Sequence, residues 1–259
     1  MTTEPSTHSD ELRTELDFAI EVARAAGEFT QRFFRTDLAI EHKSDGTPVT
    51  QADRGAEALM RAEIAARFPS DGIIGEEHDT VEGTSGRTWV LDPIDGTKSF
   101  THGVPLYANL VALVVDDEAV IGVINSPATN EMVWAAKGGG AHTPEGPARV
   151  SSHGELRRAW LMTSGFGVWP VGATERVNDA EIKLRTWGDA YGYLMVATGR
   201  AEAMVDPVAS VWDLSAPSVI VREAGGTFTA KDGSPSASAG SGLGSNGLVH
   251  DDLLRVLFP

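Results

Sequence analysis

The sequence predicts an α+β fold in which helices and strands form alternating layers. Apolar residues recur at helical spacing in a long N-terminal segment, 10–35, and short apolar runs form an antiparallel meander within 107–136. Beyond the meander, further short strands alternate with helical patterns. Helices paired with strands throughout, with a meander between them, are typical of an α+β or layered α/β/α/β architecture.

Local signals define the helices. The first helix is expected at 10–35, and the second is expected to begin near Thr50 and to end before Pro69. Thr50 can cap the N-terminus of the second helix, with Asp53 three residues further on. Helical spacing predicts three more helices, at 189–198, 214–223 and 251–257.

Strands are expected where short apolar runs end at turn residues or at carboxylates. Gly72–Gly75 and Trp89–Leu91 each lead directly into acidic residues. The remaining strands are expected at 107–115, 119–125, 132–136, 160–163, 203–205 and 227–229. The Gly/Ser/Ala stretch 234–245 is expected to be a flexible loop.

Composition excludes several classes of function. The 259 residues include 37 Asp and Glu against 21 Lys and Arg, so the net charge of −16 argues against nucleic acid or an anionic membrane as the main partner. The chain has no cysteine, which excludes a thiolate nucleophile, a disulfide framework and an iron–sulfur cluster. With only seven histidines, oxygen ligands and hard cations such as Mg²⁺ or Mn²⁺ are favoured for any metal site.

The length allows one large domain or two tightly joined ones, at about 1–150 and about 151–259. No run of 18 apolar residues is present, so no membrane span is expected. The first ten residues are polar and acidic, unlike a signal peptide. The protein is therefore expected to be cytoplasmic.

The segment Asp92–Thr97 comes directly after an apolar strand and carries two carboxylates around a turn. Pro93 fixes its φ angle and forces the turn, whereas Gly96 lets a ligand approach the backbone. An acidic surface turn is the alternative, but carboxylates at other strand ends and helix starts predict a site for a cation beside a phosphate. These other carboxylates are Glu76, Glu77 and Asp213.

From about residue 12 to 258, the sequence resembles the inositol monophosphatase family of metal-dependent, lithium-sensitive phosphatases. The segments that carry the resemblance are 43–53, 75–77, 92–100, 212–213 and 223–226. The resemblance implies a layered αβαβα sandwich, a small-molecule phosphate ester as substrate and a homodimer. It also implies two or three Mg²⁺ ions per active site, with Mn²⁺ as the alternative.

The resemblance also implies residue roles. By position, the metal ligands are the carboxylates of Glu76, Asp92, Asp95 and Asp213 and the carbonyl of Ile94. Asp53 and Thr97 resemble the pair that orients or deprotonates the attacking water, with Glu76 also in the catalytic set. Glu77 and Lys43 are auxiliary. Water would then attack in line, without a covalent phosphoenzyme, and the sequence offers no P-loop and no GxSxG motif as a rival.

Residues 185–202 resemble the histidinol-phosphatase branch of this family, which carries a WGDxYGY segment with cysteine at x, where this chain has Ala190. Histidinol phosphate carries an ammonium and an imidazole, so its pocket should offer an extra carboxylate. Asp189 is the first candidate and Asp206 the second, although Asp206 would also suit the hydroxyls of inositol. The candidate substrate-binding residues are Gly96, Thr97, Arg185, Gly188, Asp189 and Asp206.

Two of these residues have ordinary structural alternatives. Asp189 precedes an apolar helical pattern and could be a helix N-cap, and Arg185 could lie on the surface or in an interface. The expected activity is Mg²⁺-dependent hydrolysis of L-histidinol phosphate to L-histidinol, a step of histidine biosynthesis. The alternatives are an inositol-1-phosphatase of broad specificity and a non-catalytic binding or regulatory protein on the same fold.

Overall fold

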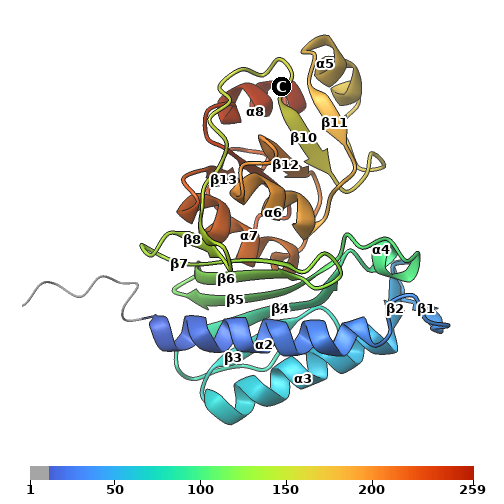
Figure 1. Cartoon of the computed structure of the whole chain (residues 1–259), viewed down its shortest axis with the longest axis vertical. Helices are drawn as coiled ribbons and strands as arrows, with labels where there is room; N and C mark the ends of the chain where they lie inside the picture. Colours follow the sequence, from blue (N-terminus) through green and yellow to red (C-terminus); the bar gives the residue numbers. More distant parts are fainter. Residues whose placement is uncertain (1–11) are drawn as a thin grey trace, which may run out of the picture.

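The computed structural model describes residues 12–259, which form five alternating layers of helices and sheets (Figure 1). The three helical layers are, in order through the molecule, α2 (Arg13–Gln31) with α3 (Gln51–Arg67), α6 (Ala190–Ala197) with α7 (Val211–Glu223), and α5 (Ala173–Asp179) with α8 (His250–Leu257). A seven-stranded and a five-stranded sheet separate these layers. The predicted αβαβα sandwich is confirmed.

The seven-stranded sheet contains the predicted meander. Its strands follow chain order, and all neighbours are antiparallel except the parallel pair β3 and β4. The strands are β3 (Gly72–Gly75), β4 (Arg87–Asp95), β5 (Ala108–Val115), β6 (Glu118–Ser126), β7 (Glu131–Ala136), β8 (Ala141–Thr143) and β9 (Gly146–Ala148). Strand β4 continues past the predicted Leu91 as far as Asp95, because a β-bulge keeps it paired with β5 beyond Asp92.

The five-stranded sheet corrects one expectation. Its order is β11 (Lys183–Arg185), β10 (Trp160–Thr163), β12 (Ala203–Asp206), β14 (Gly242–Ser245) and β13 (Thr227–Thr229). Strand β14 lies within the stretch predicted to be a flexible loop, yet it is buried and pairs on both sides. A Cβ at Gly242 would lie 2.6 Å from Leu214 and one at Gly244 would lie 2.9 Å from Tyr193. These glycines therefore serve close packing rather than flexibility.

The start of α3 agrees with the prediction, whereas the end of α2 does not. Helix α3 begins after Thr50, whose hydroxyl accepts the Ala52 N–H at 3.1 Å, while the Asp53 carboxylate accepts the Thr50 N–H at 2.8 Å. This is the predicted capping box. Helix α2 ends at Gln31, before the predicted position 35, and its predicted start at residue 10 lies outside the described residues.

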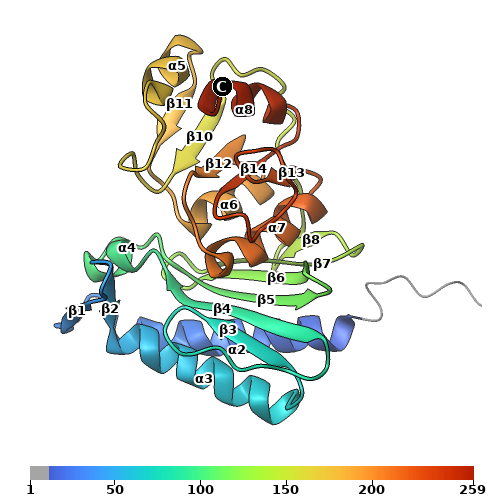
Figure 2. The same cartoon turned by 180° about the vertical axis from the view of Figure 1, so that it is seen from behind.

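The segment between α2 and α3 contains strands that the sequence analysis did not predict. It forms a small hairpin of β1 (Ile40–His42) and β2 (Pro48–Thr50), which Figure 2 shows beside α4 (Thr97–Thr101) at the end of β4. The hairpin brings Thr47 and Pro48 to the edge of the cavity described below. The hairpin, the short helices α4 and α5, and the strands β8, β9 and β11 went unpredicted because their apolar patterns are too short to recognise.

Apolar clusters fill the spaces between the layers. Trp89 of β4 packs against α2 and α3, and Tyr193 of α6 packs with Phe228 of β13 in the cluster that joins the middle helices to the sheets. Val177 and Leu253 join α5 and α8 to the outer face of the small sheet. Within residues 12–259, no helix has the length and hydrophobicity needed to cross a membrane. The expectation that no signal peptide is present concerns residues 1–10, which the structure does not describe.

Candidate active site

A cavity of about 350 Å³ opens where the end of β4 meets the first turns of α4, α6 and α7. Strands of the large sheet supply one wall and the middle helical layer supplies the other. Six carboxylates line this cavity: Glu76, Asp92, Asp95, Asp189, Asp206 and Asp213. The structure thus brings together acidic residues that are far apart in the sequence.

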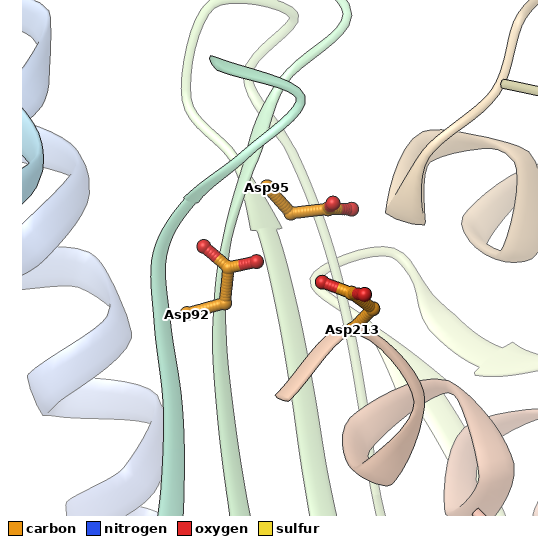
Figure 3. A group of neighbouring side chains, drawn as sticks. All are labelled: Asp92, Asp95 and Asp213. Atoms are coloured by element: carbon orange, nitrogen blue, oxygen red, sulfur yellow. The ribbon is translucent and has the colours of Figure 1, made fainter. Parts of the chain in front are cut away.

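Three of these carboxylates converge on one point, as Figure 3 shows. Asp92 lies on β4, Asp95 ends the same strand after the bulge, and Asp213 lies in the first turn of α7. One oxygen atom from each carboxylate lies within 4.8 Å of the others. Burial raises the pKa of Asp92 well above its usual range, and the nearby charges of Glu76 and Asp95 raise it further. The cluster therefore concentrates negative charge away from water.

Hydrogen bonds inside the turn after Asp92 hold this arrangement. The Asp92 carboxylate accepts the Ile94 N–H at 3.0 Å, and the Thr97 hydroxyl donates to the Ile94 carbonyl at 2.9 Å. Gly96 adopts a left-handed conformation, with φ of +83°. A Cβ there would lie 3.0 Å from an Asp189 carboxylate oxygen, so glycine also leaves room for that side chain.

Asp53 lies behind Thr97, and their side chains are linked. The Thr97 hydroxyl lies 3.2 Å from Oδ1 of Asp53, whose other oxygen accepts the Thr50 N–H of the helix cap. Asp53 is buried, and burial raises its pKa against the hydrogen bonds from Thr50 and Thr97 that lower it. Asp53 therefore reaches the cavity through the Thr97 hydroxyl.

Lys43 bridges the two glutamates that follow β3. Its Nζ lies 2.7 Å from a carboxylate oxygen of Glu76 and 2.7 Å from one of Glu77. Burial raises the pKa of Glu77 to about 7, although Lys43 opposes this shift. The buried carboxylate of Glu57 accepts the Glu77 N–H at 2.7 Å and so holds the turn in place. Lys43 thus offsets acidic charge beside the cavity.

Asp189 and Asp206 meet at the opposite wall through Ser164. The Ser164 hydroxyl donates to Asp206 at 2.7 Å and accepts the Asp189 N–H at 3.0 Å. Burial raises the pKa of Asp206 to about 7 and also raises the pKa of Asp189. Sequence reasoning did not include Ser164 among the site residues. Its position directly after strand β10, in line with the other strand-end residues, was the available signal.

The structure decides against a capping role for Asp189. The residue occupies the N-cap position of α6 with a φ angle of +52°, and among the described residues its carboxylate makes no capping hydrogen bond. It lines the cavity instead. A non-glycine residue in this left-handed conformation is strained, and such strain is often found at functional sites.

Arg185 and Gly188 do not belong to the cavity lining of residues 12–259. The exposed Arg185 guanidinium lies 5.0 Å from the centre of the Trp160 ring and 5.9 Å from that of Trp187, so cation–π attraction holds it on the surface. A Cβ at Gly188 would lie 2.4 Å from the carbonyl oxygen of Thr163, so this glycine serves close backbone packing. Contact of these two residues with the substrate stays a prediction, to which the cavity lining adds no support.

Comparison with known proteins agrees with this geometry. Residues 11–257 match the inositol monophosphatase family. The chain belongs to this family. It is 41% identical to a histidinol-phosphatase of Mycobacterium tuberculosis, over 94% of this chain and 97% of the relative. It is 43% identical to a histidinol-phosphatase of Chlorobaculum parvum, over 88% and 90%. The solved structure of a Thermotoga maritima IMPase superposes with a TM-score of 0.85 at 32% identity, over 94% and 96%.

As a member of the inositol monophosphatase family, the protein is a metal-dependent phosphatase. The side chains around the cavity fit a divalent cation, because Asp92, Asp95 and Asp213 offer oxygen ligands and their crowded negative charge needs compensation. Burial also raises the pKa of Asp95, with the charges of Asp189 and Asp213 as further causes. A bound cation would remove much of this electrostatic cost.

Proposed function

We propose that this phosphatase hydrolyses L-histidinol phosphate to L-histidinol and phosphate, with Mg²⁺ as the activating cation. One observation carries the choice of substrate: Asp189 and Asp206 place a second pair of carboxylates beside the cation cluster, with Ser164 linking the Asp206 carboxylate to the backbone N–H of Asp189. The identity of 41% and 43% to relatives named histidinol-phosphatase supports the same choice.

Oxygen ligands at the ends of β3 and β4 and at the start of α7 would hold the cation. They are the carboxylates of Glu76, Asp92, Asp95 and Asp213 and the carbonyl of Ile94. When bound, such a cation supplies positive charge that offsets the charge on the phosphate and makes coordinated water more acidic. We propose two or three Mg²⁺ ions per site, with Mn²⁺ as the alternative, and a metal titration tests both number and kind.

The attacking water would be oriented by Thr97 and Asp53. The Thr97 hydroxyl lines the cavity and lies within hydrogen-bond distance of both the Ile94 carbonyl and Asp53, so it can accept a hydrogen bond from water while it donates its single proton to one of these two oxygens. Burial raises the pKa of Asp53, which makes this carboxylate a better proton acceptor than an exposed aspartate. Glu76, which lines the same cavity, completes the proposed catalytic set. Lys43 and Glu77 act from beside it: Lys43 balances the charge of Glu76, and Glu77 shares the Lys43 ammonium.

The cationic end of histidinol phosphate matches the opposite wall. Its ammonium and imidazole would face Asp189 and Asp206, whose pKa values are raised by burial, although the charge of Lys98 opposes the shift at Asp189. Pairing with a positive group favours the ionised carboxylates and offsets their burial. Inositol phosphate is the weaker alternative, because its hydroxyls need hydrogen-bond partners but do not compensate two buried negative charges.

Phosphate release in the presence of Mg²⁺ and in the presence of EDTA tests the proposal. We expect release from histidinol phosphate with Mg²⁺ and loss of that release with EDTA. If no phosphomonoester is hydrolysed in a metal-dependent way, a binding or regulatory role replaces the proposed one. The expected homodimer stays a prediction, which light scattering coupled to size-exclusion chromatography tests. The cytoplasmic location and the place in histidine biosynthesis likewise stay predictions.

A further inference from the structure

The β-bulge in β4 leaves backbone groups without ladder partners beside the cation cluster. Asp92 pairs with Leu110 and Asp95 pairs with Ala108, so two residues of β4 face the single residue Asn109 of β5. Buried backbone groups that lose their ladder partners need others, because an unpaired one costs roughly 1–3 kcal/mol. The bulge is therefore stable only where nearby groups supply those partners.

Side chains within this segment provide hydrogen-bond partners for two of these backbone groups. A residue of the adjacent strand provides the partner for a third. The N–H and the carbonyl of Ile94 bond to Asp92 and Thr97, as described above. The Pro93 carbonyl instead accepts a hydrogen bond from Nδ2 of Asn109 at 2.6 Å. Asn109 is fully buried and lies on the adjacent strand. It is thus a contact from outside the turn that fixes the backbone between Asp92 and Asp95.

A second buried asparagine fixes the orientation of Asn109. Asn125 lies directly opposite on β6, and its Nδ2 donates to Oδ1 of Asn109 at 3.1 Å and to the Ala23 carbonyl of α2 at 2.9 Å. Because its oxygen faces a donor, the Asn109 amide must turn its nitrogen toward Pro93. A Cβ at Gly27 would lie 2.3 Å from Nδ2 of Asn125, so glycine lets α2 approach this pair.

We propose that Asn109 is a positioning residue for the cation site, with Asn125 and α2 as its support. The proposal rests on the metal-dependent function proposed above. Asp92 and Asp95 flank the bulge, so the direction of each carboxylate depends on the backbone that Asn109 holds. Ligand groups need placement to within about 0.5 Å, which a loosened bulge cannot provide. Asn109 does not touch the cavity itself and acts through Pro93.

Binding of Mn²⁺ without substrate, followed by electron paramagnetic resonance, tests the proposal. We expect Asn109→Ala to weaken Mn²⁺ binding by about tenfold or more, as the loss of a residue that orients metal ligands does. The matched control is Asn246→Ala. Asn246 is also buried and donates to a backbone carbonyl, that of His153 at 2.8 Å, at the far end of the small sheet. The control should lose thermal stability but stay within about twofold of the wild-type affinity.

Asn125→Ala provides a second variant if Asn109→Ala does not fold. This variant keeps the Asn109 amide that donates to the Pro93 carbonyl, but it removes the hydrogen bond that orients this amide. We therefore expect Mn²⁺ binding to weaken by about threefold. Wild-type affinity in a folded Asn109→Ala protein, or in Asn125→Ala when the first variant does not fold, would overturn the positioning role. A wild-type protein that binds Mn²⁺ but hydrolyses no ester would overturn the proposed function alone. One that binds no Mn²⁺ would overturn both.

Discussion

Asp92 and Asp213 come from opposite halves of the chain, yet they bring carboxylate oxygen atoms to within 4.8 Å of each other (Figure 3). Their approach depends on how α7 packs on the large sheet. A Cβ at Gly122 of β6 would lie 2.5 Å from the Ala216 carbonyl of α7, so this glycine lets the helix reach the sheet. The cation site therefore forms through tertiary packing between the two halves of the chain. Its carboxylates repel one another until a cation binds.

Replacing Asp92 by asparagine should separate activity from stability. Asp92→Asn removes a buried carboxyl group, whose pKa is raised by burial and by its acidic neighbours. The metal-free protein should therefore become more stable. The same change removes a cation ligand, and we expect kcat at saturating Mg²⁺ to fall by about 10²-fold or more. Phosphate release and urea denaturation in EDTA measure the two effects. Near-normal turnover would remove Asp92 from the site.

The stability of the metal-free protein should depend on pH. Burial raises the pKa of Asp206 to about 7 and that of Asp213 to about 6, whereas the ordinary pKa of an aspartate side chain is 3.8. The folded state therefore binds more protons than the unfolded state across this interval, and the resulting stability is lost as the pH rises through the folded values. We expect the free energy of unfolding in EDTA to fall by roughly 1–3 kcal/mol between about pH 5.5 and pH 7.5.

Urea denaturation at the two pH values measures this dependence. Saturating Mg²⁺ should reduce it, because a cation favours the ionised carboxylates. Asp206→Asn should reduce it as well, since one of the titrating groups is gone. A metal-free protein that becomes more stable over the same interval would contradict the assignment of these pKa shifts.

The Thr97 hydroxyl should matter for turnover more than for folding. Thr97→Val keeps the shape of the side chain but loses the link between the cavity and Asp53, and we expect kcat to fall by roughly 10²-fold. Thr97→Ser retains the hydroxyl and should keep most of the activity. Steady-state kinetics of the two variants at matched Mg²⁺ provide the comparison. Near-wild-type turnover in Thr97→Val, with a loss in Thr97→Ser, would indicate that packing of the methyl group matters and the hydroxyl does not.

Asp189 should determine selectivity between esters. Asp189→Ala removes a carboxylate that lines the cavity without capping α6, so histidinol phosphate should lose at least about tenfold more kcat/KM than β-glycerophosphate, which carries no cationic group. Asp179→Ala, on the surface helix α5, serves as a control of matched chemistry. Equal losses on both esters would assign Asp189 a structural role.

Local chemistry made part of this structure predictable. The capping box of Thr50 and Asp53 depends on residues three positions apart and was found where expected, whereas the turn expected directly after Asp92 is a bulge within β4, which ends only at Asp95. The acidic residues of the cavity could be named because each directly follows a strand or opens a helix. Resemblance to the family supplied their roles and the order of the layers.

Features that depend on distant parts of the chain could not be predicted. Gly242 and Gly244 have the composition of a loop, and only their fit against Leu214 and Tyr193 explains why they form a buried strand. Arg185 was expected to contact substrate, but its guanidinium lies over Trp160, a residue of another strand. Asn109 gave no signal at all, because its partner Pro93 belongs to a bulge that the sequence pattern does not reveal.

The most direct test of the central claim is the ratio of kcat/KM for L-histidinol phosphate to that for inositol 1-phosphate, measured with Mg²⁺ and with EDTA. The two buried carboxylates opposite the cation cluster predict a preference for histidinol phosphate of about tenfold or more, and loss of both activities in EDTA. A tenfold preference for inositol 1-phosphate, or turnover that survives EDTA, would contradict the account.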